Sequence, residues 1–327
     1  MRFSPVRVAL FGLFLVAAPW FVPTALRSQS DAPAAVLTSC KGAVTVFYAG
    51  GASAPATFGL PLNDGDEVKT GAGGEAEIMF SAGNWVQIGA NSSMRIKGRP
   101  GDTATKTAAG NAAKPAATSG SFEVVQSFLK LKNSEGTSSI SGLRSAEKAA
   151  ALVAVSPCQT KVRAARPTFR WKIDDTKTEL RLTLYGESGV VWQSDVTGVT
   201  ELAYPADAPA LTPGVSYSWT LETSDPMVSP PLRTPAAFFE MIAPADATAL
   251  DSELTQLDAK KPGPVTYHLM RASLFFDRGL VDDAIVETET ALANDPDNAS
   301  LHAILGRLYA ETGRTKDAIN EMNKAQQ

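Results

Sequence analysis

The stretch YHLMRASLFFDRGLVDDAIVETETALANDPDN (267–298) decides the architecture of the C-terminal part, because the chain uses its pattern twice. Shifted by 34 residues, it aligns with LHAILGRLYAETGRTKDAINEMNKAQQ (301–327). Self-similarity at such a period is the signature of a repeat array, in which each unit stacks on the next. We therefore expect two helical hairpins, with small residues where the helices approach and an aromatic ring filling the space between them. Matching positions carry similar side chains: His268 and His302, Ala272 and Gly306, Phe275 and Tyr309, Gly279 and Gly313, Ala284 and Ala318, and Ala291 and Ala325.

These small and large positions resemble those of the tetratricopeptide repeat, and Pro296 stands where that family closes a unit. The stretch ATALDSELTQLDAK (247–260) predicts one more helix before the first repeat, so the helical part covers 247–327. Two repeats are few for a stack that is stable alone. We expect them to pack on this helix, on the preceding domain or on another chain.

The resemblance to tetratricopeptide repeats implies a surface for protein partners on the concave side of the array. Phe276 is the strongest candidate on that surface, because its neighbour Phe275 takes the core position. The residues expected there lie on the first helix of each hairpin: Leu269, Ser273, Phe276, Asp277, Ala303, Arg307, Ala310 and Glu311.

The only two histidines of the chain occupy one repeat position, so duplication explains them better than catalysis does. With two histidines and two cysteines in 327 residues, the chain cannot build a multi-His/Cys metal cluster. It also lacks the G-x-S-x-G, H-E-x-x-H, Walker-type and C-x-x-C patterns that carry common chemistries. The sequence therefore predicts a protein that is not an enzyme, with no catalytic residue, no metal ligand and no cofactor.

The middle of the chain, 157–242, shows short alternating strands at the spacing of a β-sandwich. Pro-x-Phe-x-Trp at 167–171 and the later Leu-x-Pro-Gly-x-x-Tyr-x-Trp at 211–219 resemble fibronectin type III or immunoglobulin-like domains. The aromatic residues of this region could form a platform for sugars, but filling the core of a small sandwich is the favoured interpretation. They are Trp171, Trp192, Tyr217 and Trp219.

A first β-domain is predicted over 38–97, where short segments such as EAEIMF (75–80) alternate apolar and polar residues. Turn-forming residues separate these segments. In GLPLNDGDEVKTGAGGEAEIMF (59–80) we expect the glycines to bend the chain and the acidic residues to face water. The spacing of Asp64, Asp66 and Glu67 does not fit the helix–loop–helix calcium pattern.

The motif L-x-x-G-D-x-V-x-T-G at 62–71, with the strands around it, resembles a FecR-type domain. Members of that family are extracytoplasmic β-domains, and some relay siderophore signals to sigma-factor machinery. Those regulators carry a cytoplasmic helical segment before a membrane span, whereas only seven residues precede the apolar run of this chain. The resemblance therefore implies a β-domain outside the cytoplasm, without sigma regulation.

The segment 98–121 contains no aromatic residue and no Ile, Leu or Val, which predicts a flexible insertion or linker. After it, 122–156 is expected to continue the β-structure and connect to the sandwich. FEVVQSFLKLK (122–132) and SSISGL (138–143) are predicted as strands. For 145–155 a short helix and a strand-like connector remain open.

The first 30 residues have the layout of a secretory signal or membrane anchor, because Arg2 and Arg7 precede an uncharged, mostly apolar run from Val8 to Leu26. Either alternative places the body of the protein outside the cytoplasm, in the periplasm or cell envelope. A disulfide between Cys40 and Cys158 is expected in such a compartment. Two alternatives stay open, namely two separate buried thiols, or a lipidated Cys40 in the lipobox-like LTSC (37–40).

These features predict a multidomain chain: an all-β FecR-like domain, a β-sandwich and then α-helical repeat hairpins. The function they favour is a non-enzymatic cell-envelope scaffold that binds protein partners through its repeats and β-modules. The alternatives are a peptidoglycan or polysaccharide binder and a membrane-anchored signalling protein. The net charge of −4 argues against a nucleic-acid partner, which would require a basic face.

Overall fold

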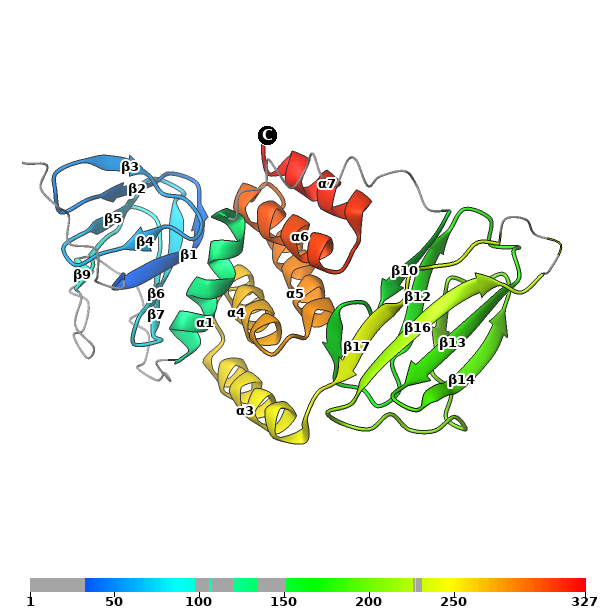
Figure 1. Cartoon of the computed structure of the whole chain (residues 1–327). Coiled ribbons are helices and arrows are strands. Elements are labelled where there is room, and N and C mark those ends of the chain that lie inside the picture. Colours follow the sequence, from blue (N-terminus) through cyan, green and yellow to red (C-terminus); the bar gives the residue numbers. More distant parts are fainter. Residues whose placement is uncertain (1–32, 98–105, 108–119, 134–150, 226, 228–230) are drawn as a thin grey trace, which may run out of the picture. The chain divides into compact units, whose positions relative to one another are not determined.

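The computed structural model describes residues 33–97, 106–107, 120–133, 151–225, 227 and 231–327. The predicted signal or anchor segment at 1–30 and the predicted strand at 138–143 lie outside these ranges. Within them, no helix has both the length and the apolar character that crossing a bilayer requires. The described part contains an N-terminal β-domain, a β-sandwich and a C-terminal helical region (Figure 1). The predicted multidomain fold class is therefore confirmed.

The N-terminal β-domain consists of two sheets with a shared apolar core. Alternation along the strands explains the core, because Leu37, Leu62, Val68 and Ile78 each point inward and are fully buried. The first sheet has the order β4-β1-β6-β7, from β1 (Ala35–Lys41), β4 (Pro61–Leu62), β6 (Glu75–Phe80) and β7 (Trp85–Ile88). The second has the order β3-β2-β5-β8-β9, from β2 (Val44–Phe47), β3 (Ser53–Pro55), β5 (Glu67–Thr70), β8 (Ser93–Arg95) and β9 (Lys106–Thr107).

The glycine-rich, acidic stretch at 59–80 is a set of turns, but not all its acids face water as expected. Asp66 is only 3% exposed, and its carboxylate accepts hydrogen bonds from the Ala49 N–H at 3.0 Å and the Asn63 N–H at 2.8 Å. Its neighbour Gly65 has a φ of 86°, a backbone conformation that favours glycine. Glu77 is also buried. The Gly-Asp pair therefore holds the turn together, and the prediction of water-facing acids was wrong for Asp66 and Glu77.

The segment predicted as a strand at 122–132 is helical, which corrects the sequence-based assignment. Helix α1 (Gly120–Leu129) continues into the short 3₁₀ helix η1 (Lys130–Asn133). Phe122, Val125 and Phe128 recur at the spacing of one helix face and are buried. The predicted linker at 98–121 also contains ordered residues, since Lys106–Thr107 pairs with β8.

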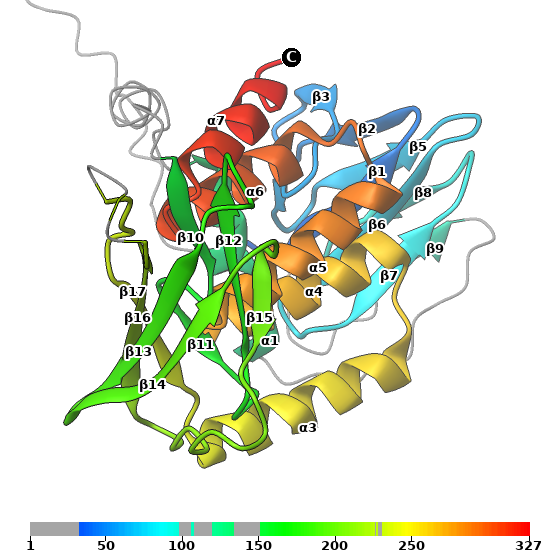
Figure 2. The ribbon, with the colours of Figure 1, turned by 90° about the vertical axis from the view of Figure 1, so that its right-hand side faces the viewer.

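The β-sandwich packs a three-stranded sheet, β10-β12-β15, against a five-stranded sheet, β11-β17-β16-β13-β14 (Figure 2). Phe169, Trp171 and Trp219 lie in its core at 0–2% exposure, and Trp192 stacks beside Phe169. The core interpretation of these aromatic residues is thus confirmed. The strands are β10 (Leu152–Ser156), β11 (Thr160–Val162), β12 (Thr168–Ile173), β13 (Leu180–Gly186), β14 (Gly189–Val196), β15 (Glu201–Ala203), β16 (Ser216–Thr223) and β17 (Ala237–Met241). Strand β10 belongs to the sandwich, whereas the sequence predicted 122–156 as a continuation of the first β-domain and a connector.

The helical region begins with α3 (Pro244–Lys260) and continues with two hairpins, α4–α5 and α6–α7. Corresponding turns contain Gly279 and Gly313, with φ angles of 75° and 76°. This matches the 34-residue shift and the predicted hairpins. The helices are α4 (Pro264–Asp277), α5 (Val281–Asn294), α6 (Ala299–Glu311) and α7 (Thr315–Lys324).

The small-residue position of the second hairpin has no room for a larger side chain. A Cβ atom on Gly306 would lie 2.8 Å from Met322 Cγ and 3.1 Å from the Ala318 carbonyl oxygen. We expect Gly306→Ala to lower the free energy of unfolding by about 1–3 kcal/mol, as overpacking does, although alanine is the better helix former. Urea unfolding measures this. The matched change Ala272→Gly in the first hairpin loses only about 1 kcal/mol of helix propensity; equal or higher stability of Gly306→Ala would contradict the close approach.

Candidate interaction surface

The surface predicted for partners lies on α4 and α6, the first helices of the two hairpins, and much of it is covered by the chain itself. Leu269 and Ser273 are each 1% exposed, and Phe276 is half-buried against the core. Asp277 is exposed. The remaining four predicted residues are half-buried and lie on α6: Ala303, Arg307, Ala310 and Glu311. The α4 half of the surface is therefore filled, and the α6 half is partly open.

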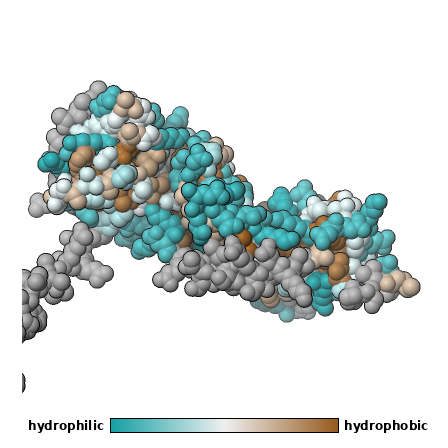
Figure 3. Space-filling model, turned by 90° about the horizontal axis from the view of Figure 1, so that it is seen from above, coloured by the Kyte–Doolittle hydropathy of each residue, from teal (hydrophilic) through white to brown (hydrophobic). Residues whose placement is uncertain are grey.

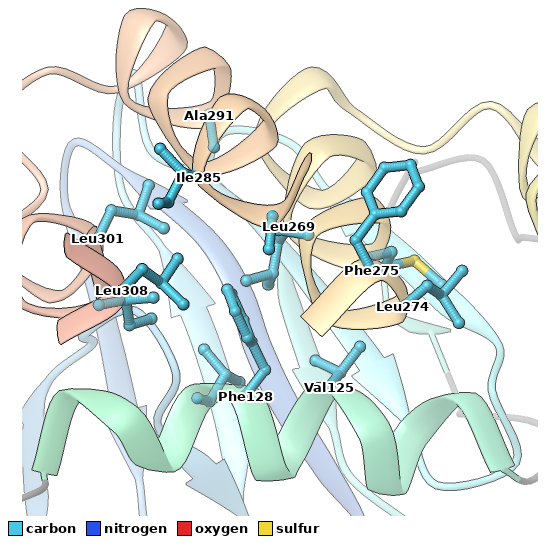
Figure 4. Packing of buried hydrophobic residues seen from close by; sticks show 14 of the residues in the cluster. Val125, Phe128, Leu269, Leu274, Phe275, Ile285, Ala291, Leu301 and Leu308 are labelled. Carbon is cyan, nitrogen blue, oxygen red and sulfur yellow. The ribbon is translucent and has the colours of Figure 1, made fainter. Parts of the chain in front are cut away.

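Helix α1 provides most of the cover. Its residues Val125 and Phe128 lie facing Leu269 of α4 and Leu308 of α6 (Figure 4). The rings of Phe128 and Phe276 pack with their centroids 5.5 Å apart at an angle of 60°. Such tilted aromatic pairs contribute about 0.5–1.5 kcal/mol beyond their buried area. Phe276 thus contacts another aromatic ring, and that ring belongs to the same chain.

The η1 helix connects α1 to the β-domain. The Lys132 ammonium donates a hydrogen bond of 2.6 Å to the Phe58 carbonyl oxygen. Burial lowers the pKa of Lys132 below its ordinary value. Phe58 is itself buried in the same apolar cluster as α1. The α1–η1 segment therefore contacts both the β-domain and the repeats.

The β-domain also covers the start of α4 directly. The Thr266 hydroxyl donates to Thr38 Oγ1 at 3.0 Å, and both residues are fully buried. The Gly263 N–H, at the N-cap of α4, donates to Glu77 Oε1 at 2.9 Å. A carboxylate here satisfies an N–H group at the helix end and favours the helix dipole. The capping bond satisfies Oε1 of Glu77, whereas Oε2 is buried without a hydrogen-bond partner in the described part of the chain.

The two histidines bridge the helices within each hairpin. His268 Nδ1 lies 2.7 Å from Glu287, and His302 Nδ1 lies 2.6 Å from Glu321. The two glutamates are also 34 residues apart. This equivalence supports the explanation by duplication. The sequence alone could have found the pairs, because the repeat shift relates both members, but the glutamates were not singled out.

The predicted disulfide is absent: Cys40 and Cys158 are free thiols in different apolar clusters. This agrees with the alternative of two separate buried thiols. Cys40 Sγ lies 3.8 Å from the Ala56 carbonyl oxygen, and burial raises the pKa of both thiols. Within the described ranges, no group of three or more His, Cys, Asp or Glu side chains is arranged to hold a metal ion.

Asp282, at the start of α5, does more than complement the helix dipole. Its carboxylate accepts hydrogen bonds from Arg314 Nη2 at 2.7 Å and from the Ser156 hydroxyl at 2.6 Å. Arg314 Nε also reaches the Val155 carbonyl oxygen at 3.4 Å. Asp282 therefore joins the sandwich strand β10 to both repeat hairpins.

The neighbouring Asp283 gives the protein a pH dependence that can be tested. Burial raises its pKa from 3.8 to about 6, opposed in part by Arg163. The folded state then binds this proton more tightly than the unfolded chain, so stability falls as the pH rises from about 4 to 6. We expect Asp283→Asn to raise the free energy of unfolding at pH 7 by about 1–3 kcal/mol. The gain should vanish near pH 4.

Urea unfolding at pH 4 and pH 7 measures this effect. Asp207→Asn, at an exposed loop position, is the control and should change stability by less than about 0.5 kcal/mol at either pH. A loss of stability for Asp283→Asn at pH 7 would contradict the expected cost of burying this carboxylate.

No family model and no curated protein matches the chain. Among solved structures, a cell surface anchoring domain is 30% identical with a TM-score of 0.20, over 22% of this chain and 97% of that one. A multi-domain immunophilin from Arabidopsis thaliana is 12% identical with a TM-score of 0.18, over 53% of this chain and 100% of that one. Because both TM-scores are far below 0.5, neither likeness carries an argument about fold or function.

Proposed function

We propose that this protein is a non-enzymatic scaffold of the cell envelope that binds protein partners through its helical hairpins and β-modules. One observation carries the proposal: the face made by α4 and α6 already receives an amphipathic helix, α1, from a distant part of the chain. Docking an amphipathic helix into an apolar groove is a common mode of protein recognition. The envelope location rests on the N-terminal apolar run.

The α6 half of this face is the part on which a partner would find polar anchors. Arg307 Nε lies 3.3 Å from Glu311 Oε1, and the two side chains are 37% and 32% exposed. Ala303 and Ala310, four residues before and three residues after Arg307, lie on the same side of α6. An arginine at the rim of a groove that is largely apolar fits the composition of protein interfaces.

The glycan-binding alternative loses three of its four aromatic candidates, because Trp171, Tyr217 and Trp219 are buried in the sandwich core, while Trp192 is half-buried against it. Most of the face visible in Figure 3 is hydrophilic, with smaller hydrophobic areas between.

The FecR-type resemblance and a role in signalling rest on the motif at 62–71 and on retention of residues 8–26 as an anchor. N-terminal sequencing of the mature protein tests the anchor directly.

The test of the scaffold function is capture of partners by the full chain from an envelope extract of the source organism. We expect Arg307→Ala to reduce recovery of a captured protein by about tenfold or more, in line with a typical hot-spot loss. Lys316→Ala, an exposed change on α7, is the control and should have no effect. Retention on purified peptidoglycan that is unchanged by Arg307→Ala, without a captured protein, would favour the glycan binder instead.

A further inference from the structure

Helix α1 has the properties of a bound ligand helix. Its buried side chains recur at positions 122, 125, 128 and 129, so they form one stripe. Glu123 and Ser127, on the other side, are exposed. An apolar stripe on a short helix is what a helix-in-groove ligand presents to its receptor.

The receptor for this stripe is the face of the repeats that was predicted for partners. Val125 and Phe128 of the stripe face Leu269 and Leu308, and the Phe128 ring also packs on Phe276. Leu129 lies beside Gly59 of the β-domain instead. The buried residues of α1 lie at 0–4% exposure, so the fit excludes water. The face of α4 and α6 beneath α1, here called the groove, therefore fits a helix with an aliphatic side chain three residues before an aromatic one.

The position of α1 in the chain separates it from the modules that it contacts. Residues 108–119 connect it to β9, and residues 134–150 connect η1 to the sandwich. As a helix it adds no strand to the sheets of the β-domain, and it lies outside the repeated unit at 267–327. Its docking therefore leaves the backbone pairing of both modules unchanged.

We propose that α1 is a resident ligand of the repeat groove, and that a partner helix with the same apolar spacing binds by replacing it. This inference rests on the proposed scaffold function and names its partner class. While α1 is docked, the fraction of open grooves is small, and the apparent affinity for a partner is reduced by that fraction. Weakening α1 without altering the groove must therefore strengthen binding in trans.

The experiment measures binding of a fluorescent peptide with the sequence of residues 120–133 to the full chain by anisotropy. We expect weak binding to the wild type and binding at least about tenfold tighter to Phe128→Ala, because its resident helix is weakened. Ser127→Ala, on the exposed side of α1, should behave as the wild type. A peptide carrying Ala in place of its own Phe128 should bind none of the three tightly.

Equal affinity of the peptide for the wild type and for a folded Phe128→Ala protein would overturn the proposal. If Phe128→Ala does not fold, hydrogen exchange on the wild type decides: excess peptide must speed exchange in the resident α1, and no change overturns the proposal. A doubled mass in light scattering, with α1 exchanged between copies, would overturn the proposal of a partner helix, because it would show that the ligand is α1 of a second copy of this chain. Loss of peptide binding with intact Arg307-dependent capture would remove this inference alone; peptide binding without any captured partner would remove the scaffold function alone.

Discussion

Asp282→Ala is expected to lower the free energy of unfolding by about 2–4 kcal/mol, because it leaves the Arg314 guanidinium without its counter-ion. The Arg314 side chain is only 13% exposed, and that of Asp282 is 20% exposed. Burial raises the pKa of Asp282 although Arg314 lies beside it. Removing Asp282 from water therefore costs more than the ion pair returns, and the penalty for breaking the pair comes from the arginine that remains.

The contribution of the ion pair can be measured separately from the cost of leaving Arg314 buried without a counter-ion. Asp282→Ala combined with Arg314→Met should recover most of the lost stability, since neither charge then stays buried. Asp251→Ala removes the partner of Arg163, where the aspartate is 60% exposed, and should cost less than about 1 kcal/mol. Urea unfolding of the wild type and of these three variants measures the differences. A double variant less stable than Asp282→Ala would show that the ion pair itself is strongly stabilising.

The repeat pattern predicted the helical region well because its determinants are local. A small residue at 272 or 306 and an aromatic one at 275 or 309 specify a close helix pair within one hairpin, and the structure has such pairs at both places. The strand alternation of the β-modules is local in the same sense. The sequence pattern and the fold agree for those helices and strands whose own residues determine which face is buried.

The coverage of the predicted interaction surface could not be read from local pattern. Phe276 is covered by Phe128, a residue 148 positions earlier, in a segment that was predicted as a strand. Asp66 and Glu77 were expected in water for a similar reason: besides the local Asn63 N–H, Asp66 accepts from the Ala49 N–H, and Glu77 accepts from the Gly263 N–H, and both donors lie in other segments. A charged side chain is expected in water unless the tertiary structure brings it a buried hydrogen-bond partner.

Phe128→Ala is expected to lower the free energy of opening of α1 by about 3–5 kcal/mol, the usual cost of truncating a fully buried phenylalanine. Phe128 is 0% exposed and packs on Phe276 across the groove. Native-state hydrogen exchange of the α1 amides measures the opening directly. Trp219, buried in the sandwich core, reports on an independent region, and the amides of β16 should keep their protection in this variant.

Comparing hydrogen exchange in α1 with exchange in β16 shows whether α1 opens independently of the rest of the protein. Phe276→Ala, which removes the same ring contact from the groove side, should also loosen α1, and the two changes together should cost less than their sum because they share one contact. A fall in protection that is equal in α1, α4 and β16 would mean that α1 opens only when the whole protein unfolds. Selective loss in α1 would mean that its docking is a separate equilibrium, and the open state is then the form that a partner helix can bind.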